Sequence, residues 1–308
     1  MAMDAQLRQD TLYGQHDSIA EMVQLSAMVA EESPQETQVG ALPEVCLALA
    51  IALTSPRDAC RCAAVSRAFR AAADSDHVWH SFLPRDLDSP AKTKKQSYLR
   101  LCDSGDAANL VDDQQCRVWL EKASGAKCYA LAARRLSLPW DDGEFSWTWT
   151  PHPLSRFAEV AELVECTGLD IYGGLPAAAL TPSTPYAAYL VYGTAEEGHR
   201  GLSYPDQETT VSVGGRVVAR YAVCLRPDEA AARKFWGVAG GVDKAAPRQP
   251  RLRDDGWWEM EMGRMCTSTA GAGDQEGCEE VVVASFEVLG WYPKRGLIVE
   301  GMEFRPVE

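Results

Sequence analysis

The sequence of 308 residues predicts a multidomain α+β protein, with a small unit of three helices followed by an antiparallel β-sandwich or barrel. Residues 42–83 repeat apolar side chains at helical spacing, whereas beyond about residue 115 the repeat changes to every second residue. Eight or nine alternating runs follow there without intervening helices, which argues against a parallel α/β sheet. Because 46% of the residues are hydrophobic and 24% are charged, most of the chain is expected to be globular.

The helical unit carries two signals for the start of a helix. In the first, Ser55 is a capping hydroxyl, Pro56 lies in the first turn and Asp58 faces the free backbone N–H groups. The second lies at residues 74–76, and Pro84 closes the helix that follows. Three short helices bury little apolar surface among themselves. The unit is therefore expected to pack on another domain or to present an apolar face to a partner.

The strand-like region is punctuated by turn residues, and Gly214-Gly215 between two β-branched runs is a strong hairpin signal. In the clearest alternation, Trp258, Met260 and Met262 share one face while Glu259 and Glu261 share the other, which predicts one buried and one solvated face. The expected strands are residues 118–120, 128–131, 158–166, 186–192, 208–213, 217–225, 257–262, 281–289 and 296–304.

Four other segments have weaker patterns. Residues 1–40 form an acidic extension, expected to be mobile, in which apolar positions between Ile19 and Val29 could form a short helix. Residues 87–114 are a polar connector with a possible helix at 98–101. Residues 228–236 are expected to form a single helix or turn, and the Gly-rich residues 271–277 a loop tip.

Composition also limits the chemistry. The formal net charge of −14 argues against a nucleic-acid or anionic-membrane partner, because phosphate binding needs a basic patch. The ten cysteines and five histidines lack zinc-ligand spacing, so no metal or cofactor is expected. We expect a reducing, intracellular environment, since no secretory signal or membrane-spanning run is found.

Catalysis is not expected either. Adjacent acids occur in Asp141-Asp142, Asp254-Asp255 and Glu279-Glu280, and on an extended strand the two members of each pair point to opposite faces. Such pairs therefore give no indication of two carboxyl groups at the distance across a cleft that glycoside hydrolysis requires. No GxSxG, P-loop or HExxH motif is found.

Residues 41–86 resemble an F-box, and most closely the F-boxes that precede phloem protein 2 domains in plants. The resemblance lies in Leu42-Pro43-Glu44, Ser55-Pro56-Arg57-Asp58-Ala59-Cys60-Arg61, Ala64-Val65-Ser66-Arg67-Ala68-Phe69 and Asp76-His77-Val78-Trp79.

Residues 115–308 resemble the phloem protein 2, or Nictaba-like, lectin domain almost throughout, which implies a jelly-roll-like β-sandwich. The pieces that carry the resemblance include Trp119-Leu120-Glu121-Lys122, Leu136-Ser137-Leu138-Pro139-Trp140, Trp147-Thr148-Trp149, Leu169-Asp170-Ile171-Tyr172-Gly173, Asp255-Gly256-Trp257-Trp258-Glu259 and Gly301-Met302-Glu303-Phe304-Arg305-Pro306. Two departures are Gly168, where the family usually has a large apolar residue, and the Pro/Gly-rich loop 238–253.

The F-box resemblance implies docking on a Skp-type adaptor, and through it on cullin and RING subunits that supply the ubiquitin chemistry. The apolar contact face is expected to come from the first helix, with Leu42, Pro43, Val45, Leu47 and Leu49. Val65, Phe69 and Trp79 are expected to fill the small core or the partner groove, and Pro56 is also assigned to the adaptor-binding residues. The alternative is that all of them are internal core residues, and Trp79 fits the core better than the contact.

The lectin resemblance implies binding of N-acetylglucosamine oligomers or N-glycans. A sugar needs a flat aromatic side chain for stacking and carboxylates for its hydroxyls. Trp140 and Trp147 lie at the family's stacking positions, Trp149 shares a face with Trp147 if the segment is extended, and Glu287 is a weaker hydroxyl acceptor. Plain packing is the alternative for the first two, a solvated strand face is the alternative for Glu287, and Trp258 and Trp291 are interpreted as packing residues.

Three functions follow from these resemblances. The first is a cytoplasmic and nuclear receptor of a ubiquitin ligase that selects glycosylated proteins. The second is the same receptor with a degenerate sugar site, which selects clients through loops 238–253 and 271–277 of the sandwich. The third is a lectin that acts independently of ubiquitination. The sequence does not determine the client, the glycan or the oligomeric state.

Overall fold

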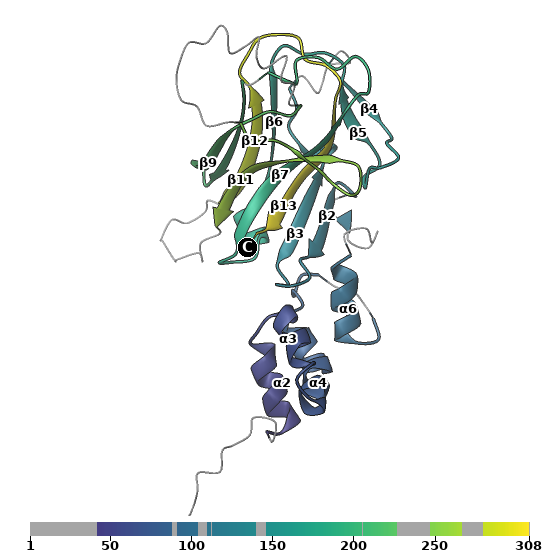
Figure 1. The fold of residues 1–308 in the computed structure, drawn as a ribbon, viewed down its shortest axis with the longest axis vertical. Helices are drawn as coiled ribbons and strands as arrows, with labels where there is room; N and C mark the ends of the chain where they lie inside the picture. The colour runs from purple at the N-terminus through teal and green to yellow at the C-terminus, as the bar shows by residue number, and fades with distance from the viewer. Residues whose placement is uncertain are drawn as a thin grey trace, which may run out of the picture.

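The computed structural model describes residues 42–87, 91–103, 110–111, 113–139, 146–204, 206–226, 247–266 and 280–307. Helices gather at one end of the molecule and strands fill the other, as Figure 1 shows. The expectations for the acidic extension, the helix or turn at 228–236 and the loop tip at 271–277 lie outside the described residues.

Between residues 42 and 87 the N-terminal unit has four helices, one more than predicted. They are α2 (Glu44–Ala52), α3 (Pro56–Cys62), α4 (Arg67–Asp74) and α5 (Asp76–Ser81). The predicted cap at Ser55 is confirmed, since its Oγ accepts a hydrogen bond from the Asp58 backbone N–H at 3.1 Å. The additional helix, α4, begins at a cap of the same kind: the Oγ of Ser66 accepts a hydrogen bond from the backbone N–H of Phe69 at 3.3 Å.

A fifth helix, α6 (Lys94–Leu101), extends the short helix expected in the connector and links the two parts of the molecule. Its Tyr98 is buried beside Trp79, with ring centroids 5.2 Å apart. The hydroxyl of Tyr98 donates to the backbone carbonyls of Glu121 and Lys122 in the β-region, both at 3.2 Å. The core of the helical unit thus continues into Leu120 of the β-region.

The β-region is mostly antiparallel, as predicted, and forms two sheets in the described part of the chain. The larger sheet has nine strands and the smaller has four, in the order β6-β12-β8-β9. The strands are β1 (Leu110–Val111), β2 (Cys116–Leu120), β3 (Lys127–Ala132), β4 (Trp147–Thr150), β5 (Val160–Leu163), β6 (Leu169–Pro176), β7 (Pro185–Thr194), β8 (Gln207–Val213), β9 (Arg216–Val223), β10 (Arg251–Leu252), β11 (Trp258–Cys266), β12 (Val281–Val288) and β13 (Leu297–Pro306).

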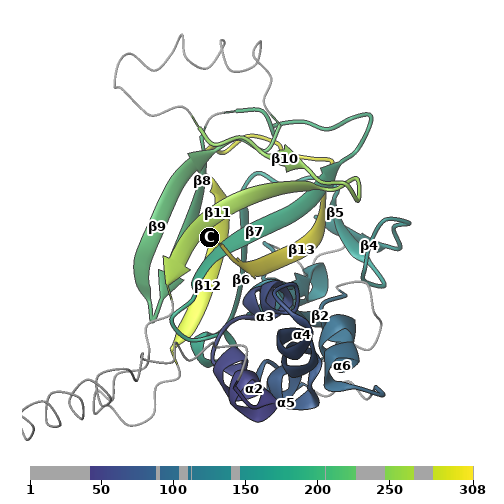
Figure 2. The ribbon, with the colours of Figure 1, turned by 60° about the horizontal axis from the view of Figure 1, so that its bottom comes forward.

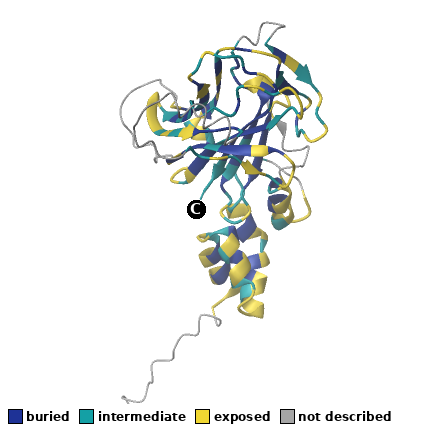
Figure 3. Ribbon diagram, turned by 45° about the horizontal axis from the view of Figure 1, so that its top comes forward, coloured by how far each residue is buried: buried dark blue, intermediate teal, exposed yellow. Residues whose placement is uncertain are grey.

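One hydrophobic core joins the two sheets. Leu190 and Met302 reach it from the nine-stranded sheet, and Val211 and Phe286 reach it from the four-stranded sheet. Figure 2 shows β8, β9 and β12 side by side, with β7, β11 and β13 running across the molecule beside them, and Figure 3 shows buried residues running through the middle of the strands. The jelly-roll-like connection of the strands stays a prediction.

Local turn chemistry agrees with the sequence at the predicted hairpin between β8 and β9. Gly214 and Gly215 have φ values of 56° and 77°, the left-handed region that glycine reaches without steric cost. The predicted alternation in β11 is only half correct. Met260 and Met262 are buried as expected, but Trp258, predicted on the same face and interpreted as a packing residue, is 37% exposed. Glu259 on the opposite face is buried as well.

Candidate functional site

The most exposed apolar surface of the helical unit follows one side of α2. Val45 is 70% exposed and Leu53 is 89% exposed, and with Leu49 they recur every four residues, which places them in one stripe. The opposite side of α2 buries Leu47, Ala48 and Ile51. The helix is therefore apolar on every side, although only one side has an internal partner, and such a helix is normally covered all round.

The residues expected to contact the adaptor divide into two groups. Leu42, Pro43, Val45, Leu49 and Val65 are exposed, so a contact role for them stays a prediction. Leu47 and Pro56 are buried, so the structure does not support a contact role for them. Trp79 is also buried, which confirms the preference for the core over the contact. Trp79 packs in the core, where its Nε1 donates to the carbonyl of Ala73 at 2.8 Å.

Pro56 is buried for a different reason, because it lies at the junction with the β-region. A Cβ added at Gly125 would meet the Pro56 ring and the Tyr98 hydroxyl, both at 3.5 Å. Phe69 is half-buried and packs against the core of the helical unit. Neither residue belongs to the stripe on α2.

The expected stacking site for a sugar is not assembled in the described part of the chain. Trp147 is only 3% exposed and its Nε1 donates to the carbonyl of Pro139 at 2.9 Å, so its ring packs in the core and offers no open face. Trp149 does share a side of β4 with Trp147, but the guanidinium of Arg134 covers one face of its ring at 3.7 Å from the centroid. Trp140 lies outside the described residues.

Glu287 lies apart from these tryptophans. It is exposed on β12, on the side of the four-stranded sheet that faces away from the core in which Trp147 is buried. In the strand register, Glu287 stands opposite Asp170 of β6 and Glu208 of β8. The structure therefore brings Glu287 together with two other carboxylates and not with Trp147.

A buried network of charges covers the outward side of the nine-stranded sheet. Glu303 is 1% exposed and lies 2.6 Å from Arg156 and 2.8 Å from Arg253. Glu259 contacts Arg251 at 2.6 Å and Arg305 at 2.7 Å, and Arg156 also contacts the buried Glu300 at 2.8 Å. Burial opposes ionisation of Glu303, but the surrounding arginines prevail and hold the pKa of its carboxyl below the usual range. Each buried acid is paired with arginine, so the loss of any one partner would leave an uncompensated buried charge.

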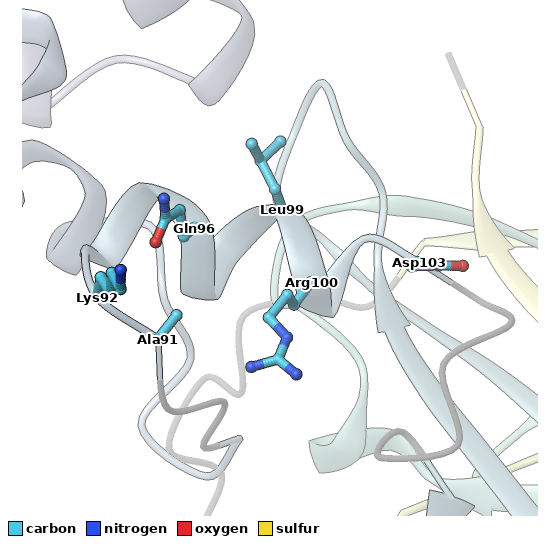
Figure 4. A pocket seen from close by; sticks show the side chains of 6 residues that line it. All are labelled: Ala91, Lys92, Gln96, Leu99, Arg100 and Asp103. Carbon is cyan, nitrogen blue, oxygen red and sulfur yellow. The ribbon is translucent and has the colours of Figure 1, made fainter.

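Two hollows accompany these elements. One of about 280 Å³ is lined by Arg251, Leu252, Arg253, Asp254, Asp255, Glu259 and Arg305 and so belongs to the charged network. The other, of about 620 Å³, lies along α6 and is lined by Ala91, Lys92, Gln96, Leu99, Arg100 and Asp103. In Figure 4 these six side chains point in different directions and do not converge on one point.

Among the described residues of the β-region, Trp291 is the most exposed large apolar side chain, and the sequence interpretation did not predict this exposure. Trp291 is 84% exposed, so its interpretation as a packing residue is wrong. A signal was available in the sequence, because Gly290 and Pro293 flank Trp291 in a turn after a strand. A residue in such a turn has no assured place in the alternation that directs side chains to the core.

The described residues contain no group of three or more His, Cys, Asp or Glu side chains arranged to hold a metal ion. None of the helices described here is long and apolar enough to cross a membrane.

The family description "F-box-like" matches residues 40–85, and "Phloem protein 2" matches residues 126–306. An F-box joined to a phloem protein 2 domain defines a class of protein, the substrate receptors of Skp–cullin–F-box ubiquitin ligases. The chain belongs to the phloem protein 2 family of F-box proteins. Members of this class generally bind a Skp-type adaptor and are not themselves catalysts.

Several relatives from Arabidopsis thaliana cover nearly the whole chain. F-box protein PP2-B15 is 35% identical over 86% of this chain and 96% of its own length. F-box protein At2g02240 is 32% identical over 98% of this chain and 88% of its own, and F-box protein VBF is 35% identical over 86% and 98%. Among solved structures, a family 35 carbohydrate binding module from Clostridium thermocellum matches 58% of this chain and 98% of its own at 11% identity, with a TM-score of 0.30. So weak a structural likeness supports no inference.

Proposed function

We propose that the exposed stripe of α2 is the adaptor-binding surface and that the β-region binds the client polypeptide directly, in the cytoplasm and nucleus. The observation that carries the first half is the apolar stripe Val45, Leu49 and Leu53, which has no internal partner in the described structure. Burial of such a stripe against a partner contributes about 25 cal/mol per Å² of apolar surface removed from water.

Direct recognition of the polypeptide is supported by the state of the predicted sugar site. Trp147 is buried and offers no open ring face, and Arg134 covers one of the two ring faces of Trp149, so the described residues do not form the expected stacking pair. Recognition of N-glycans or N-acetylglucosamine oligomers is the second candidate. The other ring face of the half-buried Trp149 and the resemblance to Nictaba-like lectins favour it.

The adaptor half is tested with the full chain co-expressed with a Skp-type adaptor. The double variant Val45→Asp/Leu49→Asp should abolish co-purification, because two carboxylates would have to be desolvated in an apolar interface. Leu252→Asp is the matched control, since Leu252 is exposed on β10 in the other part of the molecule. Retained capture by the double variant would refute the assignment of the stripe.

The client half is tested by purifying clients in the presence and absence of chitotriose. Clients that remain bound under competition, and that survive enzymatic removal of their N-glycans, support polypeptide recognition. Clients released by chitotriose, together with loss of binding in Trp149→Ala, would establish the second candidate instead.

A further inference from the structure

Trp291 lies in the connection between β12 and β13, and hydrogen bonds made by neighbouring side chains hold this connection in place. Lys294, three residues further along the chain, is buried, and its ammonium donates to the carbonyl of Thr167 at 2.6 Å and to that of Gly290. On the other side the hydroxyl of Tyr292 donates to Asp206 at 2.5 Å. The hydrogen bonds of Tyr292 and Lys294 therefore hold the backbone around Trp291, while the ring of Trp291 itself is exposed to solvent.

The indole ring lies over the beginning of β6. A Cβ added at Gly168 would stand 4.0 Å from two ring carbons of Trp291. Leu169 points into the core, so Gly168 and Asp170 both face outward. The ring therefore lies on the outward side of the four-stranded sheet, about 7 Å along the strand from Asp170.

The neighbours of Trp291 on this side combine aromatic and acidic groups. Tyr172, two residues beyond Asp170, is exposed, and so is Leu289 beside Trp291. Asp170 and Glu287 are directly opposite each other, and neither has an ion pair within the described part of the chain. Glu208 completes the row but is paired with Arg220 at 2.9 Å.

This charge pattern decides what the surface fits. Like charges directly opposite on neighbouring strands destabilise a sheet, so Asp170 and Glu287 repel each other while the surface is empty. The hydroxyls of a neutral sugar would donate hydrogen bonds to both carboxylates but leave that repulsion in place. An ammonium or guanidinium group would neutralise both acids and could also lie against the faces of Trp291 and Tyr172.

We propose that Trp291, Leu289, Asp170, Glu287 and Tyr172 form a docking surface for a lysine- or arginine-rich segment of a client protein. The inference rests on the proposed function, because it gives the client-binding half of the receptor a location. That location lies far from α2: Phe304 of β13 stands opposite Tyr129 near the helical unit, whereas Leu297 begins β13 at the other end, roughly 25 Å away. In Figure 1 the connection between β12 and β13 crosses the end of the molecule opposite the helices.

The test uses the full chain in complex with its adaptor and two fluorescein-labelled peptides, one alternating lysine with alanine and one alternating glutamate with alanine. Fluorescence anisotropy should show binding of the lysine peptide alone, and the binding should weaken as salt is raised. Trp291→Ala should weaken binding about fivefold, and Asp170→Asn/Glu287→Gln about tenfold. Trp258→Ala and Asp254→Asn, which alter exposed groups elsewhere on the β-region, should bind as the unchanged chain does.

Equal affinity for both peptides, or unchanged affinity in Trp291→Ala, would overturn the proposal. So would quenching of Trp291 fluorescence by chitotriose without any effect of the lysine peptide, because the surface would then be a sugar platform. Adaptor capture is scored in the same preparations. Capture without peptide binding rejects only this surface, whereas loss of capture by the unchanged chain rejects the receptor role itself.

Discussion

The two sheets treat their outward carboxylates in opposite ways. On the nine-stranded sheet, Glu259 and Glu303 are buried and each contacts at least two arginines. On the four-stranded sheet, Asp170 and Glu287 are exposed and have no ion pair in the described structure. Burial makes pairing obligatory because an isolated charge in a low dielectric is very costly. Exposure removes that requirement and leaves the charges available to a ligand.

The largest effect that tests this contrast is expected from Glu303→Gln. The substitution removes the Glu303 carboxylate that both Arg156 and Arg253 contact. Because this leaves buried positive charge without its partner, the free energy of unfolding should fall by about 3 kcal/mol. Glu261→Gln is the control, because Glu261 is paired with Arg248 and Arg264 but only half-buried. Glu261→Gln should lower the free energy of unfolding by less than about 1 kcal/mol, with both variants measured by urea denaturation.

Acid should reveal the same buried charge. The pKa of Glu303 is depressed in the folded state, so the stability that it contributes is present above its unfolded pKa of about 4.3 and is lost as the pH falls through the folded value. Denaturation curves measured from neutral pH downward should therefore show a weaker acid dependence for Glu303→Gln than for the unchanged chain. Parallel pH profiles would contradict this account.

Lys294→Met tests whether the Lys294 ammonium holds the connection that carries Trp291. Its effect on the free energy of unfolding is expected to be intermediate. The substitution keeps the length of the side chain but leaves the carbonyls of Thr167 and Gly290 without their donor, which should cost about 2 kcal/mol. Lys122→Met is an exposed control. A stability change no larger than that of the control would show that the ammonium does not hold the connection.

The smallest expected effect has the opposite sign. Glu287→Gln removes one of two repelling charges, so it should raise the free energy of unfolding by roughly 0.3 kcal/mol. Glu208→Gln makes a useful comparison, because it also removes the pairing with Arg220. Clear destabilisation by Glu287→Gln would mean that the carboxylate has a stabilising partner, and the contrast between the two sheets would fail.

Local patterns predicted much of the fold. Ser55 and Gly214-Gly215 act through their own backbone neighbours, so the cap and the hairpin were predictable from a few residues. The alternation in Met260 and Met262 likewise indicated the buried side of β11. Ser66 offered the same kind of signal, but the apolar repeat that runs through it suggested one continuous helix.

The candidate sites were predicted less well, because exposure depends on what packs nearby. Leu47 and Leu49 are the same residue type on one helix, yet one is buried and the other is exposed. Trp147, expected to stack on a sugar with plain packing as the alternative, is buried, whereas Trp291, interpreted as a packing residue, is exposed. Gly290 and Pro293 indicated the turn at Trp291, but nothing adjacent to Trp147 shows that its ring is covered. The partners of Glu259 come from β10 and β13 and are brought together only by the sheet.

The sequence by itself indicated most of the helices, strands and turns, because those choices depend on residues a few positions apart. It did not predict β6 or the helix that begins after Ser66. The tertiary structure alone decided which side of α2 is uncovered, which acids are paired and which tryptophan is left in solvent. The reason is that burial and charge pairing are set by side chains distant in the sequence, whose positions become fixed only when the two sheets and the helices pack together.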